Sequence, residues 1–302
     1  MENNLPKKTY KSGFVAVLGK PNVGKSTLIN SLLGQKIAAV SSRPQTTRKR
    51  QIGILTRDDA QVIFVDTPGL HQPRNKLGEN MNKEASTVME DCDLIVWIVD
   101  ASQPPDEEDL LLAGLIKNLK RKIPTLLALN KIDLVDAEEY EGSTEKYSKV
   151  LPVGETIRIS AKYGANLDTL MDMIVARLPE GELYFPSEQI TDLREREIAA
   201  DLIREAALTL LRDEVPHGIA TRIDQYQERG EQGAYIEATV FVERESHKGI
   251  VIGQGGSMLK QIGGMARKEI EAMSGRRVYL RLRVKVRKNW RNDEKVLRWL
   301  GF

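Results

Sequence analysis

Cysteine and histidine are scarce in this 302-residue sequence, which contains one cysteine and three histidines. The single cysteine, Cys92, rules out an internal disulfide and fits a reducing compartment. It lies beside an apolar run, which favours a small core residue over a nucleophile. The histidines, His71, His217 and His247, do not have the spacing of metal ligands. The sequence therefore gives no sign of a metal centre built from these residue types.

Long apolar runs are also missing. No stretch of 18 apolar residues occurs, and the N-terminus (MENNLPKKTYKS) lacks the apolar core of a signal peptide. With 41% hydrophobic and 29% charged residues, the chain suits a soluble globular protein of about two domains. We expect a cytoplasmic monomer and leave open a peripheral association with the inner face of the cell membrane.

Charge is nearly balanced overall, at +2, but it is unevenly spread. Residues 276–302 contain ten Lys or Arg against two acidic residues, so the rest of the chain is acidic on balance. Such an asymmetry predicts a polyanionic partner for the C-terminal part. The alternative is a solvated charged face.

One glycine-rich stretch carries the strongest signal. Gly19 to Ser26 reads GKPNVGKS, a full match to the phosphate-loop pattern G-x-x-x-x-G-K-[ST]. It follows an apolar run typical of a buried strand, and it precedes a helical pattern that ends near Gly34. The backbone N–H groups of such a loop bind phosphate oxygens. We expect the nucleotide to contact Gly19, Lys20, Pro21, Asn22, Val23, Gly24, Lys25, Ser26 and Thr27.

Two residues of this loop and a second motif predict a magnesium site. Lys25 is expected to reach the β- and γ-phosphates, and the Ser26 hydroxyl to ligate Mg²⁺. Downstream, the apolar run 61–66 ends in Asp66-Thr67-Pro68-Gly69. Asp66 is predicted to hold Mg²⁺ through a water molecule, and the Gly69 N–H to sense the γ-phosphate. A plain turn at the end of a strand is the alternative for this short motif.

The motif Asn130-Lys131-Ile132-Asp133 predicts a guanine base. The Asp133 carboxylate can accept hydrogen bonds from guanine N1–H and the 2-amino group, which adenine lacks on that edge. Asn130 can contact the Hoogsteen edge and Lys131 can pack its stem over the base. A site built for these bonds rejects an analogue that lacks them. Backbone N–H groups at Ser160 and Ala161, followed by Lys162, are expected to complete recognition at guanine O6. We conclude that this domain binds GTP.

These motifs follow successive apolar runs that alternate with helical patterns of 10–15 residues. That alternation predicts an α/β fold, a mostly parallel doubly wound sheet. Ligands of such sheets bind beyond the carboxyl ends of the strands, where all four motifs lie. We predict a GTP-binding domain at 1–180, a linker at 181–192 and a second domain at 193–302.

The second domain has the predicted order helix–strand–strand–helix–helix–strand. Gly253-Gln254-Gly255-Gly256 forms a G-x-x-G loop between the two adjacent helices, in an order resembling a type II KH domain, an α+β fold. Such loops clamp the backbone of about four nucleotides. A docking module for proteins is the alternative. The predicted RNA-binding residues are Lys248, Gly253, Gln254, Gly255, Gly256, Lys260, Arg283, Lys285 and Arg287.

Taken in order, GKPNVGKS, QTTR, DTPG, NKID and SAK resemble the Era family of translation-factor-related GTPases, over nearly all of the chain. The resemblance implies GTP and GDP as ligands with Mg²⁺, a partner RNA near the 3′ end of 16S rRNA, and a role in maturation of the 30S ribosomal subunit. It also implies that Thr46 or Thr47 closes on Mg²⁺ in the GTP state; we favour Thr47. The candidates for catalysis are then Lys25, Thr47, Asp66 and Gly69.

One departure from the ordinary GTPase pattern bears on the rate. Leu70 follows D-T-P-G where many GTPases carry a water-positioning glutamine, so intrinsic hydrolysis should be slow. Relatives with asparagine at the position of Asn22 use K⁺ as a fixed charge near the phosphates, which makes Asn22 a candidate K⁺ ligand. Arg48 is an alternative positive charge.

Two other functions remain open at this point. The chain is compatible with a signalling or membrane-associated GTPase whose second domain docks proteins. It is also compatible with a GTPase that acts on transfer or messenger RNA.

Overall fold

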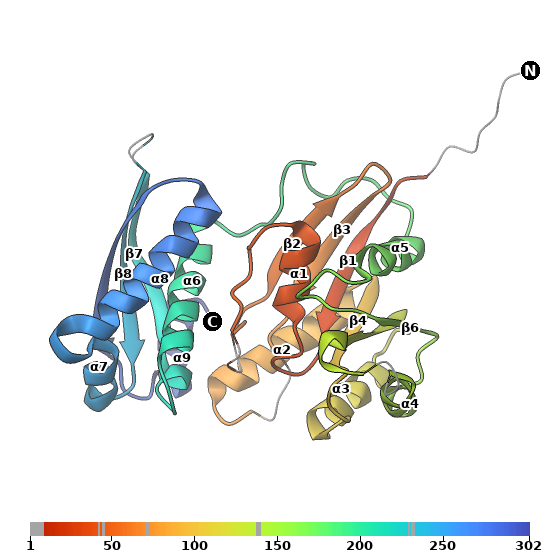
Figure 1. Cartoon of the computed structure of the whole chain (residues 1–302), viewed down its shortest axis with the longest axis horizontal. Coiled ribbons are helices and arrows are strands. Elements are labelled where there is room, and N and C mark those ends of the chain that lie inside the picture. Colours follow the sequence, from red (N-terminus) through yellow and green to blue (C-terminus); the bar gives the residue numbers. More distant parts are fainter. Residues whose placement is uncertain are drawn as a thin grey trace, which may run out of the picture. The chain divides into compact units, whose positions relative to one another are not determined.

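The computed structural model describes residues 9–41, 43, 46–69, 73–136, 140–228, 230 and 233–302. Gln45, Leu70 and His71 lie outside the described residues. Internal contacts divide the chain into two units (Figure 1). Unit 1 comprises residues 1–34, 50–70 and 85–192, and unit 2 comprises residues 35–49, 71–84 and 193–302.

Unit 1 is built on a six-stranded sheet of order β2-β3-β1-β4-β5-β6. β2 runs antiparallel to β3, and the other neighbours are parallel. Buried on both faces, the central strands read as continuous apolar runs, as parallel strands do. The predicted mostly parallel α/β sheet is confirmed. Its strands are β1 (Lys11–Leu18), β2 (Gln51–Thr56), β3 (Ala60–Asp66), β4 (Leu94–Asp100), β5 (Thr125–Asn130) and β6 (Glu155–Arg158).

Helices connect these strands in the alternation that the sequence predicts. α1 begins directly at Lys25 of the phosphate loop and ends at Gly34, whose φ is +65°. α3 begins with a capping box in which the Asp106 side chain accepts from the N–H groups of Glu108 and Asp109. The helices are α1 (Lys25–Leu33), α2 (Lys76–Asp91), α3 (Glu107–Lys117), η1 (Ile132–Leu134), α4 (Tyr140–Val150) and α5 (Leu167–Arg177).

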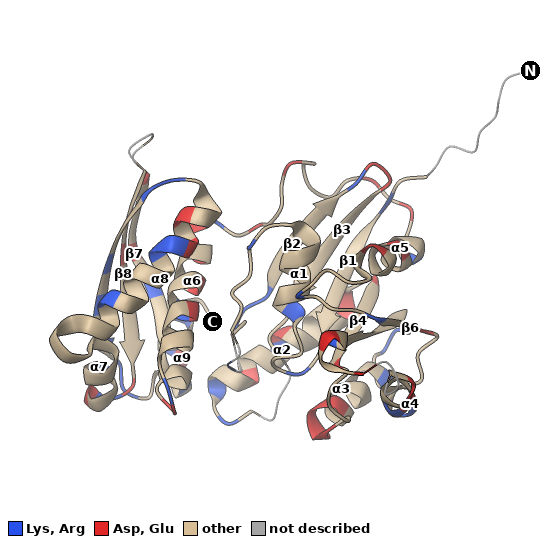
Figure 2. Cartoon of the chain, in the orientation of Figure 1, with Lys and Arg blue, Asp and Glu red and all other residues tan. Residues whose placement is uncertain are grey.

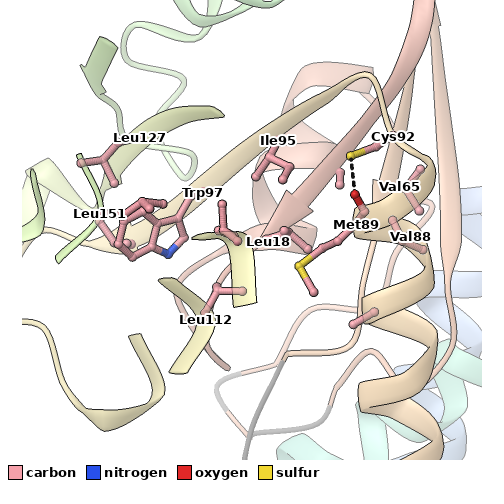
Figure 3. Packing of buried hydrophobic residues seen from close by; sticks show 14 of the residues in the cluster. Leu18, Val65, Val88, Met89, Cys92, Ile95, Trp97, Leu112, Leu127 and Leu151 are labelled. Carbon is pink, nitrogen blue, oxygen red and sulfur yellow. Dashed lines mark hydrogen bonds between the residues drawn. The ribbon is translucent and has the colours of Figure 1, made fainter. Parts of the chain in front are cut away.

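The core of unit 1 gathers around Trp97 of β4, with apolar residues of α2, α3 and α4 packed against the sheet (Figure 3). Cys92 is 1% exposed within this cluster, and its Sγ donates to Met89 O at 3.6 Å. Burial raises the pKa of the Cys92 thiol to about 11, so it stays protonated at neutral pH. The prediction of a small core residue is confirmed.

The predicted linker packs on the sheet of unit 1. The Gln61 side chain donates to Phe185 O at 2.9 Å and accepts from the Tyr184 N–H at 2.8 Å. The Ile54 N–H donates to Ile190 O at 2.8 Å. The whole predicted linker, residues 181–192, therefore belongs to unit 1 by its contacts.

Unit 2 is a three-stranded sheet of order β7-β8-β9 with α6, α7 and α8 packed on one face. β7 and β8 are antiparallel, while β8 and β9 are parallel. The predicted helix–strand–strand–helix–helix–strand order is confirmed. The main elements are α6 (Glu195–Leu210), β7 (Ala220–Glu228), β8 (Ala234–Val242), α7 (Glu245–Ile252), α8 (Ser257–Ser274) and β9 (Val278–Val286), and the short ones are η3 (Pro216–Gly218), η5 (Gln254–Gly256), η6 (Trp290–Asn292) and α9 (Glu294–Leu300).

β9 alternates between apolar and polar residues with period 2. Its apolar residues pack into the core of unit 2, and the residues between them are exposed. Trp290 is buried in a second cluster with Leu297 of α9, and its indole N–H donates to Gly218 O at 2.9 Å. Of the described helices, none is both long enough and apolar enough to cross a bilayer.

Candidate functional site

The phosphate loop is closed around its glycines. Gly24 has φ +105°, and a Cβ there would lie 2.3 Å from Asn130 Nδ2. An alanine at this position would meet both backbone strain and a collision with a buried side chain. The loop ends where α1 begins, which places it at a helix N-terminus, a position that favours bound phosphate.

Lys25 lies inside this loop and is 7% exposed. Its Nζ donates to Gly19 O and to Lys20 O, both at 3.0 Å. Burial lowers the pKa of the Lys25 ammonium to about 8. A lysine desolvated in this way gains a strong partner when phosphate oxygens enter the loop, because they favour its charged form.

Ser26 and Asp66 come together at the end of β3. The Ser26 hydroxyl donates to Asp66 Oδ2 at 2.7 Å, and Asp66 is 1% exposed. A hydroxyl and a buried carboxylate are hard oxygen donors of the kind that Mg²⁺ prefers, so this pair fits the ion that the motifs imply. Gly69 lies close by, since a Cβ on it would be 3.0 Å from the Pro21 nitrogen. The Thr67 hydroxyl donates to Val17 O at 3.1 Å and holds the turn to β1.

Asn130 joins the phosphate loop to the loop after β6. Its Nδ2 donates to Val23 O at 2.7 Å, and its Oδ1 accepts from the Ala161 N–H at 2.8 Å. The side chain is buried, so these bonds are protected from water. One asparagine thus sets the spacing between the phosphate loop and the loop expected to hold the base.

Asp133 and Lys131 lie beside this bridge. Ser160 Oγ donates to Asp133 Oδ1 at 2.5 Å, which fixes the carboxylate at the edge of an exposed site. Lys131 Nζ pairs with Asp100 Oδ2 at 2.6 Å. Burial raises the pKa of Asp100, but hydrogen bonds from Lys131 and Ser102 outweigh it and hold this pKa below its ordinary value.

The N–H groups expected to meet guanine O6 already have partners. The Ser160 N–H donates to Ala165 O at 3.2 Å, and the Ala161 N–H is held by Asn130. Recognition of O6 through them requires one of these bonds to be shared or exchanged. Lys162, the last residue of the motif, lies with its Nζ 4.7 Å from the centre of the Tyr163 ring.

Thr47 belongs to unit 2 by its internal contacts and is buried. Its neighbour Arg48 donates to Ile219 O at 2.6 Å and to His217 O at 3.1 Å. Lys36 pairs with Glu205 at 2.8 Å and with Glu269 at 2.9 Å, within the same unit. No periodic pattern in the sequence predicts this packing.

In unit 2, the predicted G-x-x-G loop borders a groove of about 490 Å³ between α8 and β9. Gly256, Lys260 and Arg267 line it on the helix side, Leu280 and Leu282 on the strand side. Lys and Arg, blue in Figure 2, occur along α8. Lys248 lies on α7, one turn before the loop, and pairs weakly with Glu245 at 3.9 Å.

The other predicted RNA-binding residues lie elsewhere. β9 sends Leu280 and Leu282 toward the helices, so Arg283 and Lys285 fall on the face of the sheet away from the helices, with Arg287 exposed just beyond the strand. Of the nine predicted residues, Gly256 and Lys260 line the groove, whereas Arg283 and Lys285 lie on this outer face.

Comparison with known proteins agrees with both units. Residues 14–131 match the family described as 50S ribosome-binding GTPase, and residues 214–291 match the KH domain. GTPase Era of Heliobacterium modesticaldum is 47% identical over 292 residues, which cover 97% of each chain. This chain belongs to the Era family of GTPases.

Solved Era structures extend the likeness. Era in complex with MgGDPNP and nucleotides 1506–1542 of 16S ribosomal RNA is 40% identical, with a TM-score of 0.91 over 97% of this chain and 99% of that one. A variant of Aquifex aeolicus Era bound to GDP and AlF4⁻ is also 40% identical, with a TM-score of 0.90 over 96% and 99%.

Two features of the sites escaped the sequence patterns. Lys20 of the phosphate loop pairs with Asp106 at 2.6 Å and with the buried Asp109 at 2.8 Å, which ties the loop to α3. Gly263 and Gly264 line the groove from the middle of α8. Glycine inside a helix is unfavourable by about 1 kcal/mol per residue, so this pair could have indicated a position where a groove or ligand requires a small residue.

Proposed function

We propose that this Era-family chain is a GTP-hydrolysing switch that binds the 3′ region of 16S rRNA and assists maturation of the 30S ribosomal subunit in the cytoplasm. The observation that carries the proposal is the Asn130 bridge, which holds the phosphate loop and the base loop together in unit 1. A groove beside a G-x-x-G loop in unit 2 supports the RNA partner. The solved Era complex with MgGDPNP and a 16S rRNA segment supports both ligands.

Each predicted residue has a role in this proposal. Lys25 leaves the carbonyls of its own loop and binds the β- and γ-phosphates, while Ser26 and Asp66 hold Mg²⁺, Asp66 through a water molecule. Mg²⁺ supplies charge neutralisation at the phosphates when bound. Thr47 joins this site in the GTP state, and the Gly69 N–H reports the γ-phosphate. We retain 1–180, 181–192 and 193–302 as the domain division.

Nucleotide choice tests the first half of the proposal. Calorimetry on the full chain should give tight binding of GTP and GDP and no measurable binding of ATP, because adenine has no N1–H and no 2-amino group to donate to the Asp133 carboxylate. Asp133→Asn should lose guanine binding by at least about 100-fold and gain xanthosine triphosphate, whose 2-oxo group accepts from the new amide. ATP binding as tight as GTP binding would contradict the proposal.

RNA binding tests the second half. Filter binding of RNA 1506–1542 of 16S rRNA should weaken steeply with salt, since each phosphate contact adds about 0.7 to the slope for a single strand. The double variant Gln254→Asp with Gly255→Asp places two carboxylates at the phosphate clamp and should abolish binding. Salt-insensitive binding would favour a protein-docking role for unit 2.

Potassium is proposed to replace a catalytic arginine. Asn22 has φ +65° in the phosphate loop, while Arg48, the alternative, is buried against carbonyls of unit 2. Single-turnover hydrolysis should be faster in K⁺ than in Na⁺, and Asn22→Ala should remove the difference. Equal rates in the two salts would remove this part of the proposal.

Peripheral association with the inner membrane face belongs to the same proposal and is supported by the basic C-terminal residues 276–302. Cosedimentation with vesicles that contain anionic lipid tests it. We also propose a monomer, which sedimentation velocity tests directly.

A further inference from the structure

The outer face of the unit 2 sheet carries an exposed aromatic pair. Tyr235 on β8 and Tyr279 on β9 are cross-strand neighbours, with ring centroids 5.4 Å apart and ring planes 7° from parallel. Tyr279 is the outer member and is 64% exposed. A flat ring of this kind can stack an unpaired base on its open side.

At the other end of this face, the aromatic side chain is covered. Phe241, also on β8, is buried beneath Trp299 of α9, at a centroid distance of 5.3 Å. Arg222 lies over the same Trp299 ring, with its Cζ 3.9 Å from the centroid. The C-terminal helix therefore covers one aromatic group of the face and leaves the Tyr235–Tyr279 pair open.

Positive charge runs along β9 beside the pair. Arg281, Arg283 and Lys285 point to the same side as Tyr279, because residues of a strand alternate between faces. Glu237 is the carboxylate between them, and it accepts from Arg281 at 3.2 Å and pairs with Arg283 at 3.1 Å. Asp224 of β7 is a second carboxylate on this face, bonded by Arg222 and close to Lys285. With Arg222 included, four cations against two carboxylates leave an excess of positive charge, which suits a phosphate backbone and not a basic or neutral protein surface.

β9 also connects this face to the groove. It is an edge strand of the sheet, and its residues Leu280, Arg281 and Leu282 line the groove. A strand of RNA that leaves the groove over β9 reaches Tyr279 and Arg281 next. The G-x-x-G clamp holds about four nucleotides, so a longer RNA has further nucleotides to place.

We infer that the outer face of the unit 2 sheet is a second RNA-binding surface, on which Tyr279, backed by Tyr235, stacks one base of a single-stranded segment while Arg281, Arg283 and Lys285 contact its phosphates. The inference rests on the proposed RNA-binding function and extends it beyond the groove. It assigns a role to the predicted basic residues that lie outside the groove.

The test compares full-length variants in binding RNA 1506–1542 of 16S rRNA and a nested series of shorter fragments, by fluorescence anisotropy. Tyr279→Ala should weaken binding of the long RNA by about 5- to 150-fold, the range for loss of one base–aromatic stack. Tyr279→Phe keeps the ring and should stay within about threefold of wild type. The shortest fragment that still binds the groove should bind Tyr279→Ala and wild type equally.

Tyr184→Ala is the matched control, because Tyr184 is also exposed, at 56%, but belongs to unit 1. It should leave RNA affinity unchanged. A 2-aminopurine base at the stacked position should be quenched by wild type and Tyr279→Phe and not by Tyr279→Ala. Circular dichroism establishes that each variant is folded.

Equal affinity of wild type and folded Tyr279→Ala for the long RNA would overturn the inference and leave the groove as the RNA site. Loss of binding in Tyr279→Phe to the same degree as in Tyr279→Ala would also overturn it, because stacking would not be the cause. If the double variant at Gln254 and Gly255 retained full affinity, the proposed function itself would fail, which is a distinct result.

Discussion

The two glycine-rich loops of this chain differ in how much space surrounds one of their glycines. In the phosphate loop, a Cβ on Gly24 would lie 2.3 Å from Asn130 Nδ2. In the G-x-x-G loop, a Cβ on Gly255 would meet no atom within 4 Å. Both glycines have left-handed φ, +105° and +58°. The first needs glycine for space and conformation together, and the second for conformation alone.

The difference follows from the ligands. A nucleotide is compact, so a loop fixed by Asn130 and closed by α1 can contact it from several sides and select its base. An RNA strand must enter and leave, so its loop stays open beside a groove and contacts only part of each nucleotide. Gly24 shapes a pocket, and Gly255 leaves room for a polymer, whereas Gly253 at the start of the same G-x-x-G loop is enclosed, since a Cβ on it would lie 2.7 Å from Met258 N.

Gly24→Ala should give the largest effect, a loss of GTP affinity of about 100-fold or more. The methyl group collides with Asn130 and breaks its buried bonds, at about 1–3 kcal/mol, and the left-handed φ adds about 1–2 kcal/mol. Calorimetry measures the affinity. Gly34→Ala is the control, since Gly34 has φ +65° and open space around it, so this variant carries the backbone cost alone. Equal effects of the two variants would show that the phosphate loop is no more enclosed than a helix end.

Gly264→Leu should raise the thermal stability of the protein while it lowers the affinity for RNA. Gly264 lies in α8 with open space at its Cβ position and lines the groove. Leucine favours the helix by about 0.8–1 kcal/mol, so thermal stability should rise. RNA affinity should fall by about 10- to 100-fold because the side chain fills the groove.

Gly114→Leu is the matched control, because Gly114 lies inside α3 of unit 1, also with open space. It should raise stability without changing RNA affinity in filter binding. RNA affinity preserved in Gly264→Leu would mean that the groove is not the RNA site.

Much of the nucleotide site was predictable because each motif depends on local chemistry. The phosphate loop, D-T-P-G and N-K-I-D are short, and the parallel sheet brings the ends of β1, β3 and β5 together without further information. The Asn130 bridge was not predictable, since Val23 and Ala161 become its partners only after distant segments fold. The same holds for the Lys20 pair with Asp106 and Asp109.

The predicted RNA-binding residues do not all lie together, and the alternation of β9 explains part of this. Leu280 and Leu282 pack toward the core, so Arg283 and Lys285, which alternate with them, point away from it. What the sequence did not show is which face borders the G-x-x-G loop, because this depends on how α8 packs on the sheet. The sequence also did not predict that residues 35–49 pack with unit 2, because the partners of Lys36 and Arg48 are distant in sequence.

Above pH 8 the affinity for GTP should fall by about tenfold per pH unit, and this dependence should distinguish the phosphate loop from the G-x-x-G loop. Burial lowers the pKa of free Lys25 to about 8, and bound phosphates raise it, so binding above pH 8 takes up a proton and affinity falls as pH rises. Stability of the free protein changes in the other direction. The unfolded chain, with its lysine pKa near about 10.4, binds more protons above pH 8, so this group's contribution to stability rises with pH.

Calorimetry between pH 7 and about 9 measures this affinity. Lys25→Met should bind GTP poorly at every pH and lose both trends. RNA binding through the G-x-x-G loop has no buried lysine of this kind and should stay flat over the same range. A flat GTP profile would show that Lys25 is not desolvated in the free loop.

Gly255→Ala should give the smallest effect. Its left-handed φ costs an alanine about 1–2 kcal/mol, so thermal stability falls slightly, but the methyl group meets open space. RNA affinity should therefore change by less than about threefold. Gly255→Asn tolerates this backbone better and should recover part of the stability. If Gly255→Ala abolished RNA binding while its unfolding temperature stayed unchanged, the RNA backbone would have to approach the loop as closely as Asn130 approaches Gly24, and the contrast between an enclosed and an open glycine loop would fail.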